Sequence, residues 1–200
     1  MAVVSKLSAD ERRAVTVEAV LKLAEKHNPS EITTAAIARH MHLTQGALFR
    51  HFPNKDAIWQ AVMDRVSERL IARLDAASRT ATSSLDALEA MFITHTSFAA
   101  DHPGALRILL GELQREMDTP AKRTARVLFS RYGELLRSVI EQGKSRGDLA
   151  PEADAASAAA LFIGMVQGLV LQSLLTGDVL RIRSHAPGVF AIYRRGLEKT

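Results

Sequence analysis

A short polar segment carries side chains that are suited to hydrogen bonding with a nucleic-acid duplex. It holds Thr44, Gln45 and Gly46, with Arg50 about one helical turn further on. A glutamine amide can make paired hydrogen bonds to adenine, and an arginine guanidinium can do the same to guanine, from the major groove. Gly46 has no side chain, so a partner can approach its backbone closely. The segment therefore indicates contact with base edges.

Hydroxyl and cationic side chains around this segment suggest contacts with phosphate. Thr34 and Thr44 fall at expected helix starts, where hydroxyls and amide N–H groups can bind phosphate oxygens. Lys55 lies in the first turn of the next expected helix, where the helix dipole disfavours a cation by about 0.3–1 kcal/mol. An external phosphate would offset that cost, although the adjacent Asp56 offers local compensation. Arg12 and Arg13 lie near the start of the first expected helix. They are either solvated charges or the sign of a nearby phosphate.

Two short helices and a tight turn are expected to position these side chains. Thr33 can cap the first helix and Thr44 the second, which ends before Pro53. His42 falls where the chain must turn, and Asn54 can cap a long following helix. A helix-turn-helix needs a bracing helix, a short turn and a second helix with a polar outer face. Residues 34–52 supply all three.

The rest of the chain predicts further helices and no strands. A capping box of Ser8 and Glu11 starts a helix over 8–27, before the helix-turn-helix. Helix-like segments follow at 84–100, 103–117, 120–146, 152–176 and 186–198, and no segment alternates with period two. We expect an all-α protein of about nine helices. A three-helix helix-turn-helix domain (1–56) is joined by a long fourth helix to a helical bundle for ligand binding and dimerisation (57–200).

Composition narrows the class of protein. The chain has 200 residues and no cysteine, so disulfides are excluded. Its formal net charge of +4 is compatible with a polyanionic partner but does not prove one. Residues 155–177 carry no charge, but their serines, glutamines and acidic flanks argue against a membrane span. We find no phosphate-binding glycine loop, nucleophile elbow or zinc-binding helix motif. The expectation is a cytoplasmic protein that is not an enzyme and has no cofactor, metal or membrane partner.

The run ITTAAIARHMHLTQGALFRHFPNKDAIWQAV resembles the DNA-binding region of TetR-family transcriptional regulators, over roughly residues 10–64. The shared order is TT before IA, a Thr-capped helix, LF, HF and then NK. The resemblance implies phosphate contacts from Thr34, Thr44, His51 and Lys55, and contacts with bases or the groove wall from Gln45, Gly46 and Phe49. The full set of expected DNA contacts is Thr33, Thr34, Thr44, Gln45, Gly46, Ala47, Phe49, Arg50, His51 and Lys55.

Three positions depart from the family pattern. His42 stands where a glycine is common, so it must adopt a left-handed backbone or shift the turn. Phe49 is often tyrosine in the family, so a hydroxyl contact with phosphate is lost. Ala35 stands where some members have an arginine that reaches a base, so that contact is absent.

Small residues along segment 152–176 predict a close helix–helix contact. The partner helix could belong to the same chain, but a homodimer is favoured because a palindromic duplex requires twofold symmetry. The resemblance implies that the last two helices form that contact. The expected interface residues are Ser157, Ala160, Gly164, Gly168, Leu171, Val189 and Tyr193.

A ligand pocket is expected inside the bundle, with a mostly apolar lining and a few polar groups. The polar groups of the lining would be His95, Tyr132 and Gln167. A mostly apolar lining with these few polar groups predicts a lipophilic or aromatic effector. A histidine in an apolar face is also common as a hydrogen-bonded core residue. The expected lining is Phe92, His95, Phe98, Leu109, Leu113, Phe129, Tyr132, Phe162, Met165 and Gln167.

Together these patterns predict a ligand-responsive transcriptional repressor. A homodimer would bind a palindromic double-stranded DNA operator, and a small effector would release it. Two alternatives remain at this point. One is a small-molecule-binding or metal-sensing regulator with an activator role, and the other is a helical interaction protein that does not bind DNA.

Overall fold

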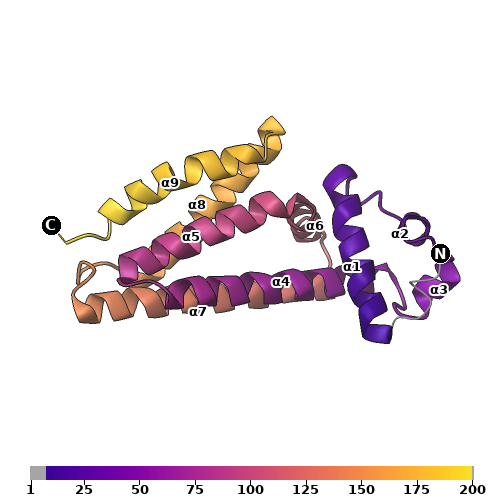
Figure 1. The fold of residues 1–200 in the computed structure, drawn as a ribbon, viewed down its shortest axis with the longest axis horizontal. Coiled ribbons are helices and arrows are strands. Elements are labelled where there is room, and N and C mark those ends of the chain that lie inside the picture. The colour runs from indigo at the N-terminus through magenta and orange to yellow at the C-terminus, as the bar shows by residue number, and fades with distance from the viewer. Residues whose placement is uncertain (1–7, 200) are drawn as a thin grey trace. The chain divides into compact units, whose positions relative to one another are not determined.

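The computed structural model describes residues 8–199, and that range contains nine α-helices and no strands (Figure 1). This confirms the expected all-α class. The helices are α1 (Ala9–Lys26), α2 (Thr34–His40), α3 (Gln45–Phe49), α4 (Lys55–Arg79), α5 (Ser84–Asp101), α6 (Pro103–Leu113), α7 (Pro120–Arg146), α8 (Ala155–Thr176) and α9 (Leu180–Arg195).

The helix starts follow the capping residues expected from the sequence. Ser8 and Glu11 form the capping box of α1. The Thr33 hydroxyl accepts from the Ala36 amide at 3.1 Å in α2, and the Asn54 carboxamide accepts from the Ala57 amide at 2.8 Å in α4. Each cap satisfies an amide that has no partner within its own helix.

The last helix differs from the expectation. It begins at Leu180 rather than at 186 and continues through Pro187. Proline lacks the amide proton of the helical hydrogen bond, so the sequence pattern favours a helix that starts just before it. Pro187 is exposed, on the outer side of α9.

Contacts divide the chain into two compact units: residues 1–68 with 102–127, and residues 69–101 with 128–200. Residues 102–127, placed by sequence in the C-terminal domain, therefore pack with the N-terminal helices. Helix α6 approaches α1 closely at Gly104, where an added Cβ would lie 2.2 Å from the Leu21 carbonyl oxygen of α1. Only a glycine allows these two helices to pack so closely.

Replacing Gly104 by alanine should destabilise the fold, because the methyl group would push α6 away from the α1 backbone. We expect a loss of about 1–3 kcal/mol in the free energy of unfolding, as for other overpacked sites. Chemical denaturation measures it. Gly111→Ala in the same helix is the matched control, since its Cβ would meet only the Pro29 side chain at an ordinary 3.9 Å. Equal stability of the two variants would contradict the close packing of α6 on α1.

In the second unit, α9 lies along α5 and α8 (Figure 1). Aromatic side chains fill the core between these helices and α7. The Phe162 ring contacts Phe92, Tyr132 and Tyr193 edge-on, with ring centroids 5.2–6.1 Å apart. Phe190 completes the cluster against Phe92 and Tyr193. Such edge-to-face pairs add to the stabilisation that comes from burying the rings.

Candidate functional site

The turn between α2 and α3 is set by His42, which has a φ of 56°. Its amide donates to the Arg39 carbonyl at 3.0 Å, and the Leu43 amide donates to the Ala38 carbonyl at 2.8 Å. These two bonds form a Schellman motif, which requires a left-handed residue at this position. Of the two possibilities that the sequence left for His42, the structure has the left-handed backbone. The Thr44 hydroxyl then caps α3 by accepting from the Ala47 amide at 3.2 Å.

Helix α3 presents two distinct faces. Leu48, and Phe52 just beyond the helix, are almost fully buried. Phe49 keeps 42% of its surface exposed, and Gln45, Gly46 and Arg50 are exposed beside it. Of the expected DNA contacts, Thr33, Thr44, Gln45, Gly46, Phe49 and Arg50 are exposed, and Thr34, Ala47, His51 and Lys55 are half-buried. The side chains expected to contact bases thus share the open face of one short helix.

A hydrogen bond joins two expected DNA contacts across the turn. The Gln45 side-chain amide donates to the Thr34 hydroxyl oxygen at 2.7 Å. Because the hydroxyl accepts this bond, its own proton remains available for an acceptor such as a phosphate oxygen. The bond also fixes the direction of the Gln45 amide, which lowers the entropy cost of ordering it on a base.

The two arginines of α1 hold α3 in place. The Arg13 guanidinium donates to the His51 carbonyl at 2.7 Å and lies 4.5 Å from the centre of the Phe52 ring. Arg12 lies beside the His51 imidazole, with Arg12 Nη1 and His51 Nε2 3.5 Å apart. Arg13 therefore pairs with a backbone group at the end of α3, which neither of its two interpretations from sequence anticipated.

Lys55 is half-buried and has partners within the chain. Its ammonium lies 3.3 Å from the Pro29 carbonyl, 3.4 Å from the Ser30 carbonyl and 5.1 Å from the centre of the Trp59 ring. Burial, followed by repulsion from Arg115, lowers the pKa of Lys55. Local compensation at this helix start thus comes from backbone carbonyls and a ring as well as from the neighbouring acid.

Asp56 pairs with Arg115 of α6, with Arg115 Nη1 and Asp56 Oδ1 2.8 Å apart. The same guanidinium lies 3.2 Å from the carboxylate of Glu112, whose side chain is buried and also accepts from the Thr119 hydroxyl. This cluster ties the start of α4 to the end of α6. Sequence analysis did not identify it. Its only local signal is the spacing of Glu112 and Arg115, three residues apart on one helix.

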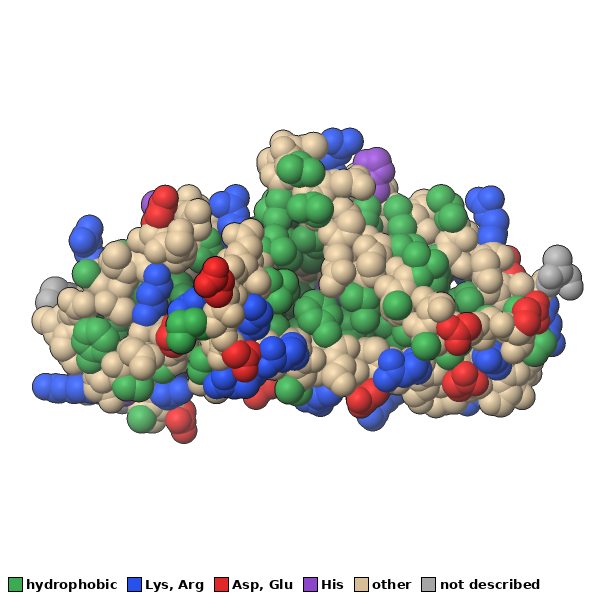
Figure 2. Space-filling model, turned by 180° about the vertical axis from the view of Figure 1, so that it is seen from behind, with side chains coloured by type: hydrophobic (Ala, Val, Ile, Leu, Met, Phe, Trp, Pro, Cys, Tyr) green, Lys and Arg blue, Asp and Glu red, His purple; other side chains and the backbone are tan. Residues whose placement is uncertain are grey.

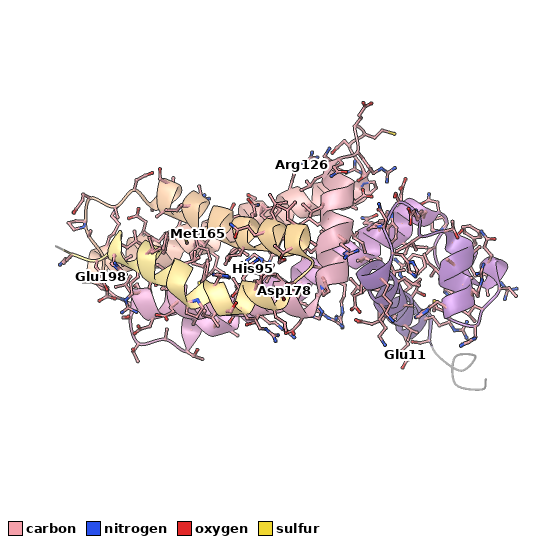
Figure 3. All side chains as sticks on the ribbon, turned by 90° about the horizontal axis from the view of Figure 1, so that it is seen from above. Glu11, His95, Arg126, Met165, Asp178 and Glu198 are labelled. Carbon is pink, nitrogen blue, oxygen red and sulfur yellow. The ribbon has the colours of Figure 1, made fainter. Side chains whose placement is uncertain are left out.

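The expected effector residues are only partly brought together. Phe92, Tyr132 and Phe162 belong to the buried aromatic core, and Phe98 is also buried. Phe129 and Met165 are half-buried in the same unit, and Figure 3 shows Met165 on α8 and His95 within this unit. Gln167 does not join them, because it lies on the exposed side of α8. Leu109 and Leu113 belong to the other unit, and Leu113 is 45% exposed.

His95 and Tyr132 form a polar pair at the edge of the aromatic core. His95 Nδ1 lies 3.1 Å from the Tyr132 hydroxyl oxygen. Burial lowers the pKa of His95 to about 4, and burial raises the pKa of Tyr132. The residue His95 retains some accessible surface, but its ring is enclosed by protein, and the enclosure of the ring determines the pKa. Both side chains are therefore neutral at physiological pH.

The neutral state of His95 should make the fold sensitive to acid. An unfolded chain takes up a proton on this imidazole below pH 6.5, whereas the folded chain does so only near pH 4. The free energy of unfolding should therefore fall as the pH drops from 6.5 to 4, by up to about 3 kcal/mol from this residue. Urea unfolding of wild type and His95→Gln at several pH values measures the difference. Carboxylates contribute equally to both proteins, so parallel pH profiles would contradict the assignment.

One side of α8 has no packing partner among residues 8–199. We call Ser157, Ala160, Gly164, Gly168 and Leu171 the α8 face; Gly168 is half-buried and the other four are exposed. An added Cβ at Gly164 or Gly168 would meet no atom of the described part of the chain within 4 Å. Large apolar side chains are exposed around this face: Leu161, Leu171 and Leu175 on α8, and Leu180 and Ile192 on α9. Figure 2 shows hydrophobic side chains gathered in patches on one face of the molecule.

Two interface residues expected on α9 lie differently. Val189 is half-buried, while Tyr193 is buried within its own chain, where its hydroxyl donates to the Ala158 carbonyl at 3.0 Å. The tyrosine is therefore a core residue, and burial raises its pKa. Among the described residues, α8 is also long and apolar enough to cross a membrane by length and composition, and part of it is buried against the rest of the chain.

Comparison with known proteins places both halves of the chain in one family. Residues 17–62 match the family of bacterial regulatory proteins named after TetR, and residues 81–171 match a tetracyclin repressor-like C-terminal domain. The nucleoid occlusion factor SlmA of Alteromonas mediterranea is 30% identical over 160 residues, covering 80% of this chain and 82% of that protein. SlmA of Marinobacter nauticus is 26% identical and covers 86% and 87%.

Solved structures agree with this fold. The fatty acid degradation regulator FadR of Bacillus halodurans has a TM-score of 0.82 at 16% identity, with 92% of this chain and 95% of that chain covered. FadR of Bacillus subtilis in complex with stearoyl-CoA has a TM-score of 0.79 at 15% identity, with 90% and 97% covered. The exposed helix α3, its capped turn and the matches along both halves lead to one assignment: the chain belongs to the TetR family of DNA-binding transcriptional regulators and is not an enzyme.

Proposed function

We propose that this regulator is a repressor that binds a palindromic operator as a homodimer and is released by a small lipophilic or aromatic effector. The observation that carries the proposal is the pair of unpartnered surfaces: the exposed side of α3 and the α8 face. One suits a DNA groove and the other suits a second copy of the chain. Because the operator lies on the chromosome, the protein acts in the cytoplasm.

The α8 face supports the homodimer. Two glycines with open space above them let a second helix approach closely. The exposed leucines around them would cost free energy in water, since burial stabilises by about 25 cal/mol per Å² of apolar surface. A twofold dimer buries the same patch on both copies and presents two α3 helices to a palindrome. A membrane span would require the buried side of α8, which packs on α5 and α9, to face lipid instead.

The open side of α3 supports the assignment of DNA contacts. Gln45, Gly46 and Arg50 would approach base edges, and Phe49 would pack against the groove wall. Thr33, Thr34 and Thr44 lie at helix starts, where free amides and hydroxyls favour phosphate. Ala47 and His51 lie at the edge of this surface. Lys55 would keep its backbone partners and offer its remaining donor to a phosphate, since an ammonium has three.

The aromatic core supports an apolar effector with few polar groups. His95 and Tyr132 are neutral, so this region offers no charge to compensate a buried anion. The complex of a structural neighbour with stearoyl-CoA shows that this fold can hold a long acyl chain in that protein. Helices α4 and α7 contribute residues to both units, so a change around His95 can be transmitted to the first unit along them.

Gel-shift experiments with duplexes from around the protein's own gene test the proposal. Purified dimer should shift one duplex containing an inverted repeat at modest salt, and excess unrelated DNA should not compete. Wild-type protein that shifts every duplex equally would argue against an operator-specific repressor. Acyl, aromatic or steroid-like compounds should then release the protein from the operator. They should raise its apparent Kd for the operator without dissociating the dimer.

A second candidate function follows from the nucleoid occlusion factors, which match this chain along both halves. A protein with such a role would bind sites spread over the chromosome instead of one or a few promoters. Mapping the bound sites in cells distinguishes the two functions. A few sites at promoters support the repressor, whereas many dispersed sites support nucleoid occlusion.

A further inference from the structure

We propose that the second unit carries a separate binding site for a small hydrophilic oxyanion, at the end of α4. A pocket of about 460 Å³ opens there between the last turn of α4, the connector to α5, the first turn of α5 and the C-terminal half of α7. This volume lies within the range of small-molecule sites. The site is distinct from the proposed effector region and does not depend on DNA binding.

The lining of this pocket is polar, unlike that of a typical apolar ligand site. Serine hydroxyls come from three of its walls: Ser78 on α4, Ser83 before α5 and Ser138 on α7. Gln142 of α7 adds an amide. The Ser78 hydroxyl donates to the Asp75 carbonyl and the Ser83 hydroxyl to the Asp86 carboxylate, so each has a lone pair left to accept from a ligand. The Ser138 hydroxyl accepts from the Gln142 amide and keeps its own proton to donate. Such groups suit a ligand with several hydroxyl groups.

The charges at the pocket favour an anion. Arg79 lies at one side and forms an ion pair with Asp75, with Arg79 Nη2 and Asp75 Oδ2 2.8 Å apart. Arg146 lies at the other side, in the last turn of α7, and has no carboxylate partner among residues 8–199. One guanidinium is therefore neutralised and the other is free to bind. A guanidinium binds phosphate or carboxylate oxygens through two parallel hydrogen bonds.

Beside the pocket, the start of α5 is packed tightly against α7. An added Cβ at Gly143 of α7 would lie 2.6 Å from Ser84 Cβ and 2.7 Å from Leu149 Cδ1, so the start of α5 packs directly on the α7 backbone. The Ser84 amide also donates to the Asp148 carboxylate at 3.2 Å. These contacts fix the two helices on either side of the pocket. A preformed site loses less entropy when a ligand binds.

The pocket is separate from the aromatic core. Tyr132 of α7 is buried and contacts the Phe162 ring of that core, whereas Leu135 and Val139 line the pocket on an adjacent side of the helix. Arg146 follows Tyr132 by 14 residues, which corresponds to about 21 Å along a helix. One ligand of ordinary size cannot occupy both places, so the oxyanion would be a second ligand.

Isothermal titration of the full-length protein with ribose 5-phosphate, citrate and ribose tests the proposal at physiological salt. We expect saturable binding of at least one of the two oxyanions and none of ribose. Arg146→Gln should weaken that binding about tenfold or more, because it removes a charge-assisted hydrogen-bond pair. Gln142→Ala should weaken it less. Amide NMR shifts should be confined to the walls of the pocket.

Arg137→Gln is the matched control, since Arg137 is exposed on the same helix and does not line the pocket. It should change the Kd less than twofold. Binding of ribose 5-phosphate but not citrate, or of citrate but not ribose 5-phosphate, would support the site and identify its class of oxyanion. Absence of saturable binding, equal losses in Arg146→Gln and Arg137→Gln, or NMR shifts elsewhere would overturn the proposal.

Discussion

Replacing Gly164 by arginine should convert the proposed dimer into a monomer and lower operator affinity by about a hundredfold or more. The arginine would stand on the α8 face, where no atom of the same chain lies within 4 Å of the added Cβ. Its side chain can extend into solvent in the monomer, so the fold should survive. In a dimer, two arginines would meet near the twofold axis, with steric overlap and like charge. Each helix-turn-helix domain would then bind one half-site alone. It would lose the gain from being linked to a second domain, which is worth 10²–10⁴ in affinity.

Analytical ultracentrifugation, thermal unfolding and operator gel shifts measure the three effects of Gly164→Arg separately. Ala76→Arg on the exposed side of α4 is the control, because it adds the same side chain to another helix surface. The control should remain dimeric and should bind the operator normally. A Gly164→Arg protein that sediments as a dimer and binds as tightly as wild type would rule out the α8 face as the interface.

The helix-turn-helix was largely predictable because its determinants are local. A cap is a contact between residues three apart, so Thr33, Thr44 and Asn54 mark helix starts in the sequence itself. The exposed and buried sides of α3 follow from the helical period. His42 required a left-handed backbone or a shifted turn, and two backbone bonds at that turn show that the backbone is left-handed.

Contacts between distant segments could not be predicted from the sequence. Arg13 and His51 are 38 positions apart, and Arg115 and Asp56 are 59 apart. The sequence shows where the arginines are, but an arginine can hydrogen-bond to water, a phosphate, a carboxylate or a carbonyl. Only the fold determines which of these partners it has. Lys55 is similar, because its carbonyl partners come from the turn after α1.

The bundle was harder to assign because α8 carries no charged side chain and only a few polar ones. Such a helix has no charged stripe to show which side faces the core. Gln167 was therefore expected in the pocket and lies on the exposed side. Tyr193 was expected at the interface and is buried in the protomer. The start of α9 was also missed, since Val179 makes no side-chain cap and Pro187 gives a stronger but misleading signal.

Replacing Gly46 by alanine should lower operator affinity while leaving the protein at least as stable. No atom of residues 8–199 lies within 4 Å of a Cβ added at Gly46, and alanine is favoured over glycine in a helix by up to about 1 kcal/mol. If the α3 backbone approaches DNA as closely as proposed, the methyl group must displace a base or phosphate. An overpacked contact costs about 1–3 kcal/mol, which corresponds to roughly a 5- to 150-fold weaker Kd.

Fluorescence anisotropy with operator and unrelated duplexes measures the affinity of the Gly46→Ala protein for DNA. Thermal unfolding measures its stability. Gly111→Ala on α6 controls for the general effect of removing a helical glycine and should leave the Kd unchanged. Loss of affinity with retained stability would place the clash at the DNA contact, because residues 8–199 leave room for the methyl group. Unchanged operator affinity would mean that the backbone at Gly46 stays at least a methyl group away from the duplex. Base recognition would then have to come from longer side chains such as Gln45 and Arg50, which can reach base edges across that gap.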